Sequence, residues 1–378
     1  MPGPGIPAFF RGSIEEYCPM TIAVAVSGGT DSLYALASLC RRSADPARDV
    51  IALHARFRDP SPENDPVPEL ETRCLELGVA LHVLDLREAF ASLIIRPFVE
   101  TYVSGRTPNP CVRCNALVKF GLLLDEARRL GAEKIATGHY VRLEAHPRYG
   151  LALRQGEDET KDQSYFLALT PMDRLRNAVF PLGGTCKNVV RDQLREWGLP
   201  VPLPGESQEI CFIPDDDYRA FLKASGVRLP AGGPMVLEDG LVVGRHGGLW
   251  QYTEGQRRGL GVSWKEPLYV IGKDRSRNTL LLGTAAELPV SGCVADELNF
   301  LVPPALWPNE LRVRVRYRQK AIPADVHLVG GGSDGMDATA RMLVRFHAPQ
   351  LPYAPGQLVA VFDEQGCVLA GGVIRKDG

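Results

Sequence analysis

The first half of the chain alternates short, continuously apolar runs with segments whose apolar residues recur at helical spacing. The apolar runs predict buried strands and are residues 21–26, 50–53, 81–84 and 134–137. The segments with helical spacing are residues 33–37, 68–77 and 120–130. Strands that are apolar on both faces and alternate with helices indicate a parallel sheet covered on both sides. We therefore predict an α/β fold with a doubly wound parallel sheet that extends to about residue 200.

The pattern changes after the proline-rich segment VPLPGES at residues 201–207. A short helix is expected at 217–224, and glycine-rich text typical of hairpins follows it. Beyond residue 284 the chain has alternating strands, such as 311–317 and 357–361, spaced as in a small β-barrel. We expect a parallel-sheet domain, a small central domain and a C-terminal β-barrel, at residues 1–213, 214–284 and 285–378.

Composition narrows the class of protein. A chain of 378 residues is too long for one compact core. Its formal net charge of −2 argues against a strongly basic coat for nucleic acid, although a local basic patch would still suffice for RNA. No apolar run approaches the roughly 18 residues that a membrane span needs, and the N-terminal text lacks the basic and apolar regions of a signal peptide. The odd number of cysteines, nine, fits a reducing compartment. We expect a cytoplasmic protein without a membrane partner.

A predicted strand, the hexapeptide SGGTDS at residues 27–32 and a predicted helix follow one another directly. Gly28 and Gly29 let the backbone approach a phosphate, and N–H groups of the loop and of the helix N-terminus form an anion-binding nest. Asp31 is suited to hold Mg²⁺ against the phosphates. The alternative is an ordinary glycine turn before a helix capped by Asp31 or Ser32. The sequence GxxxxGK[ST], which marks the P-loop, does not occur.

The hexapeptide resembles the PP-loop of the ATP pyrophosphatase superfamily. The resemblance implies that ATP is cleaved between its α- and β-phosphates, leaving an adenylated carbonyl oxygen that a nucleophile can displace. His54 joins the predicted site because it ends the second strand, where this class of fold places the adenine. The predicted ATP-binding residues are Ala25, Val26, Ser27, Gly28, Gly29, Thr30, Asp31, Ser32, His54 and Gly138.

A second segment with chemical potential is PNPCVRCN at residues 108–115. Its prolines and asparagines predict a rigid, irregular loop, and a thiol held in such a loop is positioned for reaction more than for packing. The segment resembles the matching loop of the tRNA-specific 2-thiouridylase family. The resemblance extends over nearly the whole chain, at ATGHY (136–140), KDQSYFL (161–167), FPLG (180–183), SQEICF (207–212), GRHGG (244–248), YTEGQR (252–257), RYRQ (316–319) and PGQ (355–357).

That family replaces O2 of the wobble uridine, position 34, by sulfur in tRNAs for Glu, Gln and Lys. The resemblance implies that ATP and Mg²⁺ adenylate the uracil oxygen and that Cys211 carries a persulfide, received from a sulfur-carrier protein or a cysteine desulfurase. Cys114 would complete the transfer, by releasing sulfide or by closing a disulfide with Cys211. Near cations, such thiols are expected to have lowered pKa values. The residues expected to contact tRNA are Asn109, Pro110, Cys111, His139, Lys161, Asp162, Gln163, Tyr317, Arg318 and Gln357.

Cys111 departs from one form of the family pattern, because many members carry aspartate there. With Cys114 and Cys211 it offers three thiolates, and two interpretations stay open. Cys111 is either an extra thiol near the target base or one of three ligands of a [4Fe–4S] cluster whose open iron binds and delivers sulfide. A zinc site is a third option that lacks a clear fourth ligand.

Cations alternate along the predicted strand at 311–317 and just beyond it, which would direct all of them to one face. They are Arg312, Arg314, Arg316, Arg318 and Lys320. Such a row matches an RNA backbone and would bind it without sequence preference. The alternative is a solvated barrel face, and the resemblance at Tyr317 and Arg318 favours contact with tRNA.

The sequence thus predicts a three-domain, ATP-dependent tRNA sulfurtransferase that releases AMP and pyrophosphate. Two other functions stay open. One is a PP-loop ligase or amidotransferase acting on a small carbonyl substrate, which would need neither Cys114 nor Cys211. The other is a non-catalytic protein that binds tRNA or carries an Fe–S cluster.

Overall fold

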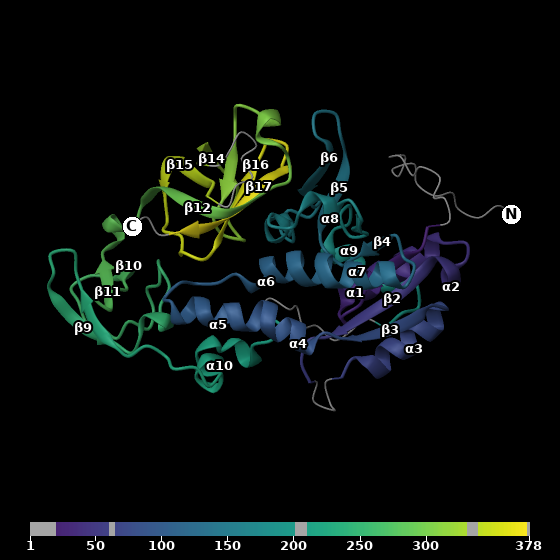
Figure 1. The fold of residues 1–378 in the computed structure, drawn as a ribbon, viewed down its shortest axis with the longest axis horizontal. Coiled ribbons are helices and arrows are strands. Elements are labelled where there is room, and N and C mark those ends of the chain that lie inside the picture. The colour runs from purple at the N-terminus through teal and green to yellow at the C-terminus, as the bar shows by residue number, and fades with distance from the viewer. Residues whose placement is uncertain (1–19, 60–64, 201–209, 331–338, 376–378) are drawn as a thin grey trace.

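A computed structural model describes residues 20–59, 65–200, 210–330 and 339–375 (Figure 1). Its first part is built on a five-stranded sheet in the order β3-β2-β1-β4-β7, and every neighbouring pair in it is parallel. The strands are β1 (Ile22–Ala25), β2 (Val50–Arg56), β3 (Ala80–Asp85), β4 (Lys134–Ala136) and β7 (Ala178–Val179). The predicted strands are confirmed, and the strand order reverses direction between β1 and β4.

Both faces of this sheet are covered, as the continuous apolar strands predicted. Along β1, Ile22 and Val24 belong to one hydrophobic cluster and Ala23 to another, because successive side chains of a strand point to opposite faces. Helices α1 and α9 pack on the first face and α7 on the second. The helices of this part are α1 (Thr30–Arg42), α2 (Pro46–Asp49), α3 (Val67–Leu77), α4 (Arg87–Phe90), α5 (Arg96–Val103), α7 (Leu123–Arg129), α8 (Met172–Leu175) and α9 (Lys187–Glu196).

The predicted helix at 120–130 begins ten residues earlier than expected. A helical run starts at α6 (Pro110–Arg113), continues as the π-helix η4 (Cys114–Leu122) and ends in α7. The expectation of an irregular loop over 108–115 is therefore wrong for most of that segment. Asn109 is the N-cap, its side chain accepts a hydrogen bond from the Val112 N–H, and Pro110 is the first helical residue, where proline costs no hydrogen bond.

Smaller elements complete this part of the chain. The π-helix η3 (Ala91–Ile95) lies between α4 and α5. The antiparallel hairpin β5 (Val141–His146) and β6 (Gly150–Gln155), which the sequence pattern did not predict, is followed by the 3-10 helix η5 (Ser164–Leu167). No helix among the described residues combines the length and the apolar character that crossing a membrane requires.

A small central unit follows, with its own sheet in the order β10-β11-β8-β9. Its elements are α10 (Tyr218–Ala224), β8 (Gly233–Val236), β9 (Val242–His246), β10 (Tyr269–Asp274) and β11 (Thr279–Gly283), so the helix expected at 217–224 is confirmed. The ammonium of Lys273 is buried and donates to the carbonyl of Gly105 at 2.8 Å. This hydrogen bond joins the central sheet to the end of α5.

The last part is a closed barrel in the order β12-β15-β14-β13-β16-β17. Its strands are β12 (Val290–Phe300), β13 (Arg312–Arg314), β14 (Ile322–Val329), β15 (Arg341–Gln350), β16 (Leu358–Phe362) and β17 (Val368–Arg375). Barrel residues Leu358 and Phe362 share a hydrophobic cluster with Ile135 of β4 and Leu124 of α7. The barrel therefore packs on the parallel-sheet unit, above the α6–α7 run in Figure 1. The predicted fold class is confirmed.

Candidate active site

The loop after β1 lies where the strand order reverses, the position at which open parallel sheets bind ligands. Gly28 has φ +82°, a conformation that favours glycine. Gly138, just beyond β4, approaches the loop so closely that a Cβ added to it would lie 3.0 Å from the carbonyl carbon of Asp31. The residues predicted from Ala25 to Ser32 and Gly138 thus come together in one crevice.

The serines of this loop are bonded to the loop itself. The Ser32 hydroxyl accepts from the Ser27 N–H at 3.1 Å and donates to the Gly29 carbonyl at 2.9 Å. Gly29 is the N-cap of α1, and no side chain caps the helix there. Neither Asp31 nor Ser32 therefore caps the helix, and the alternative of an ordinary capped turn is wrong. N–H groups of the first turn point outward at the positive end of the helix dipole and suit an anion.

Asp31 is held from two sides. Its Oδ1 accepts from Lys187 Nζ at 2.5 Å and from the Tyr140 hydroxyl at 2.8 Å. The Lys187 ammonium also lies 5.7 Å from the centre of the Tyr140 ring. The sequence analysis missed Lys187, because nothing in the local pattern links the first turn of α9 to a loop 156 residues earlier.

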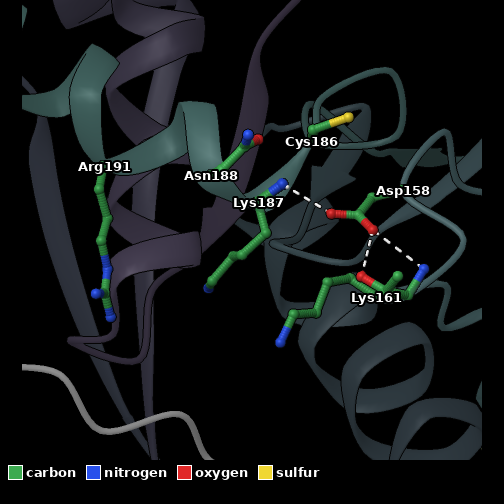
Figure 2. A pocket seen from close by; sticks show the side chains of 7 residues that line it. Asp158, Lys161, Cys186, Lys187, Asn188 and Arg191 are labelled. Atoms are coloured by element: carbon green, nitrogen blue, oxygen red, sulfur yellow. Dashed lines mark hydrogen bonds between the residues drawn. The ribbon is translucent and has the colours of Figure 1, made fainter.

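A pocket of about 710 Å³ opens beside this loop (Figure 2). It is lined by Asp158, Thr160, Lys161, Cys186, Lys187, Asn188 and Arg191. Asp158 accepts from the Lys187 backbone N–H at 3.0 Å and from the Thr160 hydroxyl at 2.6 Å. The carboxylate therefore anchors the start of α9, while Lys161, Lys187 and Arg191 give the pocket its positive charge. Lys161 was predicted to contact tRNA, and here it lines the pocket next to the ATP loop.

His54 is buried behind the loop rather than open to it. Its Nδ1 donates to the carbonyl of Val26 at 2.9 Å, which fixes the end of β1. In this arrangement His54 supports the backbone at the entrance to the loop.

The cysteines predicted to react gather around one hydrophobic cluster. Cys111 and Cys114 lie three residues apart at the start of the α6–η4 run, so both face the same side of the helix. Cys114 is buried, Cys111 partly buried and Cys211 exposed. Phe212 packs in the same cluster as Cys114, which brings Cys211 to the helix start. Residues 207–209 of the predicted second cysteine motif lie outside the described residues.

The three thiols act on one another and share one cation. Burial raises the pKa of Cys114 to about 12, and the Lys119 ammonium opposes this. Burial likewise raises the pKa values of Cys111 and Cys211, and Lys119 again lowers each in part. Cys211 adds to the rise in the pKa of both Cys111 and Cys114. The expectation of lowered thiol pKa values is therefore wrong for this state, because removal from water outweighs the nearby cation.

His139 connects the thiols to the ATP loop. Its ring is buried, and its Nε2 lies 3.5 Å from Lys119 Nζ while its Nδ1 lies 2.8 Å from the Thr137 hydroxyl. Burial, reinforced by Lys119, holds the pKa of His139 well below 6.5. The ring is therefore neutral at physiological pH, with Nε2 accepting from Lys119 and Nδ1–H donating to Thr137. Because Gly138 touches Asp31, the segment 137–139 lies between the two sites.

The barrel holds the backbone that leads into the cysteine helix. Gln357 Nε2 donates to the carbonyls of Thr107 and Pro108 at 3.1 and 2.8 Å, and the Thr107 N–H donates to the Pro355 carbonyl at 2.8 Å. Gln357, predicted to contact tRNA, thus binds the segment that carries Asn109 and Pro110.

The predicted row of cations on one barrel face is wrong. Strand β13 ends at Arg314, whose side chain is buried and donates to Asp162 Oδ2 at 2.5 Å. The same guanidinium also donates to the carbonyl of Tyr317, so the chain turns away after Arg314 instead of extending to Lys320. The pairing with buried Asp162 drew Arg314 inward. Arg316, Arg318 and Lys320 stay exposed, and Arg312 is partly buried.

Other predicted RNA contacts also have roles inside the protein. Asp162 is 3% exposed and accepts from the Ser164 N–H and hydroxyl besides Arg314. Gln163 Oε1 accepts from the Tyr140 N–H at 3.0 Å. The Tyr317 ring lies 4.4 Å from that of Phe166. These residues form the seam between the parallel-sheet unit and the barrel.

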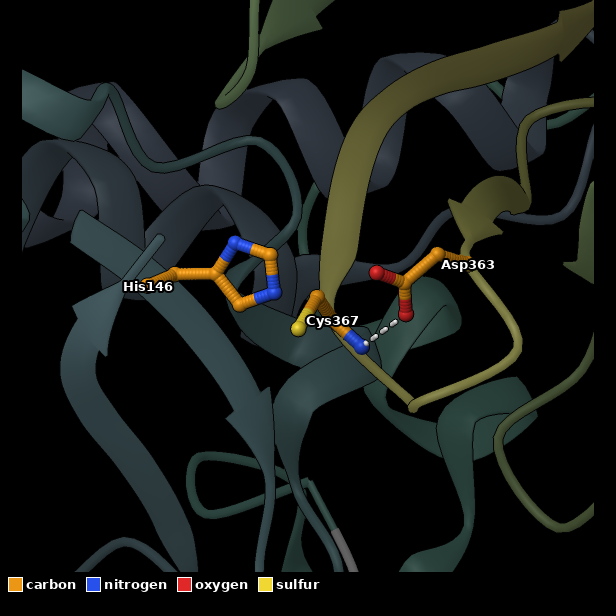
Figure 3. Close-up of side chains that lie close together, drawn as sticks. All are labelled: His146, Asp363 and Cys367. Atoms are coloured by element: carbon orange, nitrogen blue, oxygen red, sulfur yellow. Dashed lines mark hydrogen bonds between the residues drawn. The ribbon is translucent and has the colours of Figure 1, made fainter. Parts of the chain in front are cut away.

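Among the described residues, one group of histidine, cysteine and aspartate side chains lies close enough together to be a candidate for holding a metal ion. This group, His146, Asp363 and Cys367, has its donor atoms within 4.8 Å of one another (Figure 3). His146 Nδ1 accepts from the backbone N–H groups of Arg148 and Tyr149, so its Nε2 carries the proton and offers no lone pair to a metal. Burial and Asp363 raise the pKa of Cys367 to about 12, which keeps the thiol protonated. The group lies at the contact between hairpin and barrel, where the Tyr149 hydroxyl donates to Asp363 Oδ2 at 3.1 Å.

The sulfur atoms of Cys111, Cys114 and Cys211 do not all lie within 4.8 Å of one another. The four donors of a zinc site lie closer together than that, so this part of the described structure does not present a preformed zinc site. A cluster with several irons requires wider spacing, and three thiols are a donor set that suits it.

Comparison with known proteins gives matches over most of the chain. Residues 20–215 match the tRNA methyl transferase HUP domain, residues 220–284 the tRNA methyl transferase PRC-barrel domain, and residues 290–374 the aminomethyltransferase beta-barrel domain. The chain is 59% identical over 358 residues to the tRNA-specific 2-thiouridylase MnmA of Lawsonia intracellularis, covering 95% of this chain and 100% of that protein.

Two further relatives carry the same name. The protein of Nitratidesulfovibrio vulgaris is 55% identical over 94% of this chain and 99% of its own length, and that of Pelobacter propionicus is 41% identical over 95% and 99%. Among solved structures, U34-tRNA thiolase NcsA from Methanococcus maripaludis with its [4Fe-4S] cluster matches with 16% identity and a TM-score of 0.33, over 55% of this chain and 65% of that one. A similarity this low carries no argument about the site.

Proposed function

Since this chain belongs to the tRNA-specific 2-thiouridylase family, we propose that it replaces O2 of the tRNA wobble uridine by sulfur in a reaction that uses ATP. The observation that carries the proposal is the meeting of two sites at residues 137–139. Gly138 touches Asp31 of the ATP loop, and His139 meets Lys119, the cation shared by the thiols. A ligase that acts on a small carbonyl substrate does not require thiols linked to its ATP loop.

The first step is adenylation of the uridine. The loop after β1 and the N-terminus of α1 would bind the phosphates, and Asp31, which accepts from Lys187, would hold Mg²⁺. O2 of the uracil attacks the α-phosphorus, the bond to the β-phosphate oxygen breaks, and pyrophosphate leaves. O2 then departs as part of AMP when a nucleophile adds to C2, because AMP is a far better leaving group than oxide.

The second step is sulfur transfer. A sulfur-carrier protein or a cysteine desulfurase leaves a persulfide on Cys211, whose residue is exposed at the surface although the protein encloses much of its sulfur atom. The terminal sulfur attacks C2 and displaces AMP, which forms a Cys211–S–S–C2 adduct. The Cys114 thiolate then attacks Sγ of Cys211; the disulfide between Cys114 and Cys211 forms, and the electron pair leaves with the sulfur now bonded to C2. A cellular dithiol reduces the disulfide for the next cycle.

The raised pKa values fit thiols that are protonated in the resting protein and form thiolates only during the reaction. A buried thiol is protected from oxidation while it is protonated. Lys119 is the group that lowers the pKa of all three thiols, so its ammonium stabilises each thiolate as it forms. Neutral His139 accepts a hydrogen bond from Lys119 and thereby fixes the direction of that ammonium.

For tRNA, we propose direct contact by Asn109, Cys111 and Tyr317 and by the exposed Arg318, with the buried Pro110 fixing the helix start beneath them. Asp162, Gln163 and Gln357 would shape this surface from behind. The substrates proposed are the tRNAs for Glu, Gln and Lys. Exposed cations after β13 supply charge for a phosphate backbone, and this attraction weakens with salt.

The three thiols also suit a second version of the same reaction. Cys111, Cys114 and Cys211 would hold a [4Fe–4S] cluster, and the iron without a protein ligand would bind and deliver sulfide. The observation that favours this version is that Cys111 and Cys114 face one side of the helix start and that Phe212 brings Cys211 to the same place. Iron and sulfide analysis after anaerobic purification distinguishes the two: full activity without iron excludes the cluster.

The proposal is tested by incubating the protein with ATP, Mg²⁺, a persulfide donor and unmodified tRNA for lysine, followed by analysis of nucleosides. We expect 2-thiouridine from the native chain and none from Cys211→Ser or Cys114→Ser, while Cys293→Ala, which removes a thiol from the barrel core, stays active. Unchanged turnover of a small carbonyl substrate by Cys211→Ser would support the ligase, and tRNA binding without pyrophosphate release would support a non-catalytic protein.

A further inference from the structure

The pocket beside the ATP loop contains the cations Lys161, Lys187 and Arg191, and the steps described above give them no role in adenylation. We propose that Lys187 and Arg191 of α9, with Lys161, form the site for the β- and γ-phosphates of ATP, and that this pocket holds pyrophosphate as it leaves. This inference rests on the proposed function, because it names the residues that receive the leaving group of the first step.

Lys187 is the residue nearest to the reaction. Its side chain is 17% exposed, and its ammonium lies 2.5 Å from Asp31 Oδ1. An ammonium that is mostly enclosed and bonded to the phosphate loop is placed to contact a phosphate bound in that loop. Asp31 would hold Mg²⁺ when that ion is bound, and the Lys187 ammonium would then be available to the phosphates.

Arg191 lies one turn further along α9 and lines the same pocket. Its Nε is buried and has no hydrogen-bond partner in the described structure. A buried guanidinium nitrogen without an acceptor is costly, and an anion in the pocket would supply one. In Figure 2 the side chains of Lys161, Lys187 and Arg191 extend toward the same side of the pocket.

The chemistry needs positive charge at this position. As O2 of uridine bonds to the α-phosphorus, the bond from that phosphorus to the bridging oxygen breaks, and its electron pair passes to pyrophosphate. Cations fixed beside that oxygen stabilise the charge that develops in the transition state. A volume of about 710 Å³ is ample for a triphosphate tail.

A tRNA phosphate is the competing occupant of these cations. Two observations favour the nucleotide. Lys187 is bonded to the ATP loop itself, and the Lys187 side chain and the Arg191 Nε are largely enclosed, whereas backbone contacts to nucleic acid come mostly from exposed cations on open surfaces.

Equilibrium binding of magnesium pyrophosphate, ATP and AMP tests the inference on the full chain. For Lys187→Gln and Arg191→Gln we expect affinity for pyrophosphate and ATP to fall about tenfold or more, the loss of one charge-assisted hydrogen bond, with AMP affinity within about twofold of native. Arg195→Gln is the control, since Arg195 lies on the same helix, is mostly exposed and pairs with Asp192. Retained AMP affinity also shows that each variant is folded.

Unchanged pyrophosphate affinity in both variants overturns the inference. So does a loss of tRNA affinity with pyrophosphate affinity retained, which would make the pocket an RNA contact. The assay contains no tRNA thiolation, so a chain that binds pyrophosphate through Lys187 but forms no 2-thiouridine refutes the proposed function and leaves this inference standing.

Discussion

Lys119 influences all three thiols, and at Cys211 the Arg58 guanidinium acts in the same direction. Its ammonium lowers the pKa of Cys111, Cys114 and Cys211 against the effect of burial. Lys119→Met removes this cation, so the pKa of each thiol rises further and the thiolate fraction at any pH below it falls. We expect alkylation of Cys211 by iodoacetamide to slow several-fold at pH 8 and its pH profile to move to higher pH.

Lys119→Arg keeps the charge and should leave the alkylation profile near that of the native chain. Lys223→Met, which removes an exposed lysine of α10, is the matched control. An alkylation profile that Lys119→Met does not move would show that the thiols do not rely on this ammonium.

Gln357 could either contact tRNA or position the backbone before Cys111, and the sequence alone could not distinguish these two roles. The sequence predicted a contact with tRNA, whereas the side chain donates to the carbonyls of Thr107 and Pro108 before the cysteine helix. If it positions that helix, Gln357→Ala should lower kcat of thiolation roughly tenfold, as the loss of one to two hydrogen bonds allows, with the KM for tRNA little changed.

The control for this prediction is Gln365→Ala, which alters an exposed glutamine of the same barrel. A rise in the KM for tRNA with kcat retained would instead indicate that Gln357 contacts tRNA directly.

At the scale of elements, strand β13 and the segment after β6 are fixed to each other by one buried ion pair. Arg314 and Asp162 are 7% and 2% exposed at their side chains and 2.5 Å apart. Arg314→Met leaves the Asp162 carboxylate buried without its cation, and such losses cost about 3–5 kcal/mol. We expect the free energy of unfolding, measured with urea, to fall by about that amount.

Arg312→Met in the same strand serves as control and should change the free energy of unfolding by less than about 1 kcal/mol. In the double variant Asp162→Asn with Arg314→Met, the loss should be smaller than the sum of the two single losses. Strict additivity would mean that the pair does not join the two elements.

Elements that depend on local signals could be predicted from the sequence. The ATP loop lies in six consecutive residues between an apolar strand and a helix, so its glycines and Asp31 were found directly. The start of the helix at Pro110 had a local signal too, asparagine followed by proline, but the same residues also favour turns. The alternation of arginines after Leu311 indicated a strand, yet it could not reveal that Arg314 turns inward.

Contacts between distant parts of the chain could not be predicted, because a local pattern contains no information about which surfaces meet. Lys187 reaches Asp31 across 156 positions, and Gln357 reaches Pro108 across 249. The raised thiol pKa values follow from the same cause, since burial of Cys114 depends on packing against residues such as Phe98 and Phe212.

At the scale of the whole molecule, three parts of the chain meet around the helix that begins at Pro110. The parallel sheet supplies the ATP loop, the segment before α10 supplies Cys211, and the barrel holds the backbone before Cys111. Activation of uridine and delivery of sulfur are therefore expected to be coupled, with neither proceeding usefully alone.

That coupling is tested most directly by measuring AMP, pyrophosphate and 2-thiouridine together in one reaction with tRNA for lysine, ATP and a persulfide donor. The account predicts one AMP and one pyrophosphate for each 2-thiouridine formed, and from Cys211→Ser pyrophosphate release that depends on tRNA without any 2-thiouridine. Formation of 2-thiouridine by Cys211→Ser, or its formation by the native chain with ADP as the product, would contradict the account.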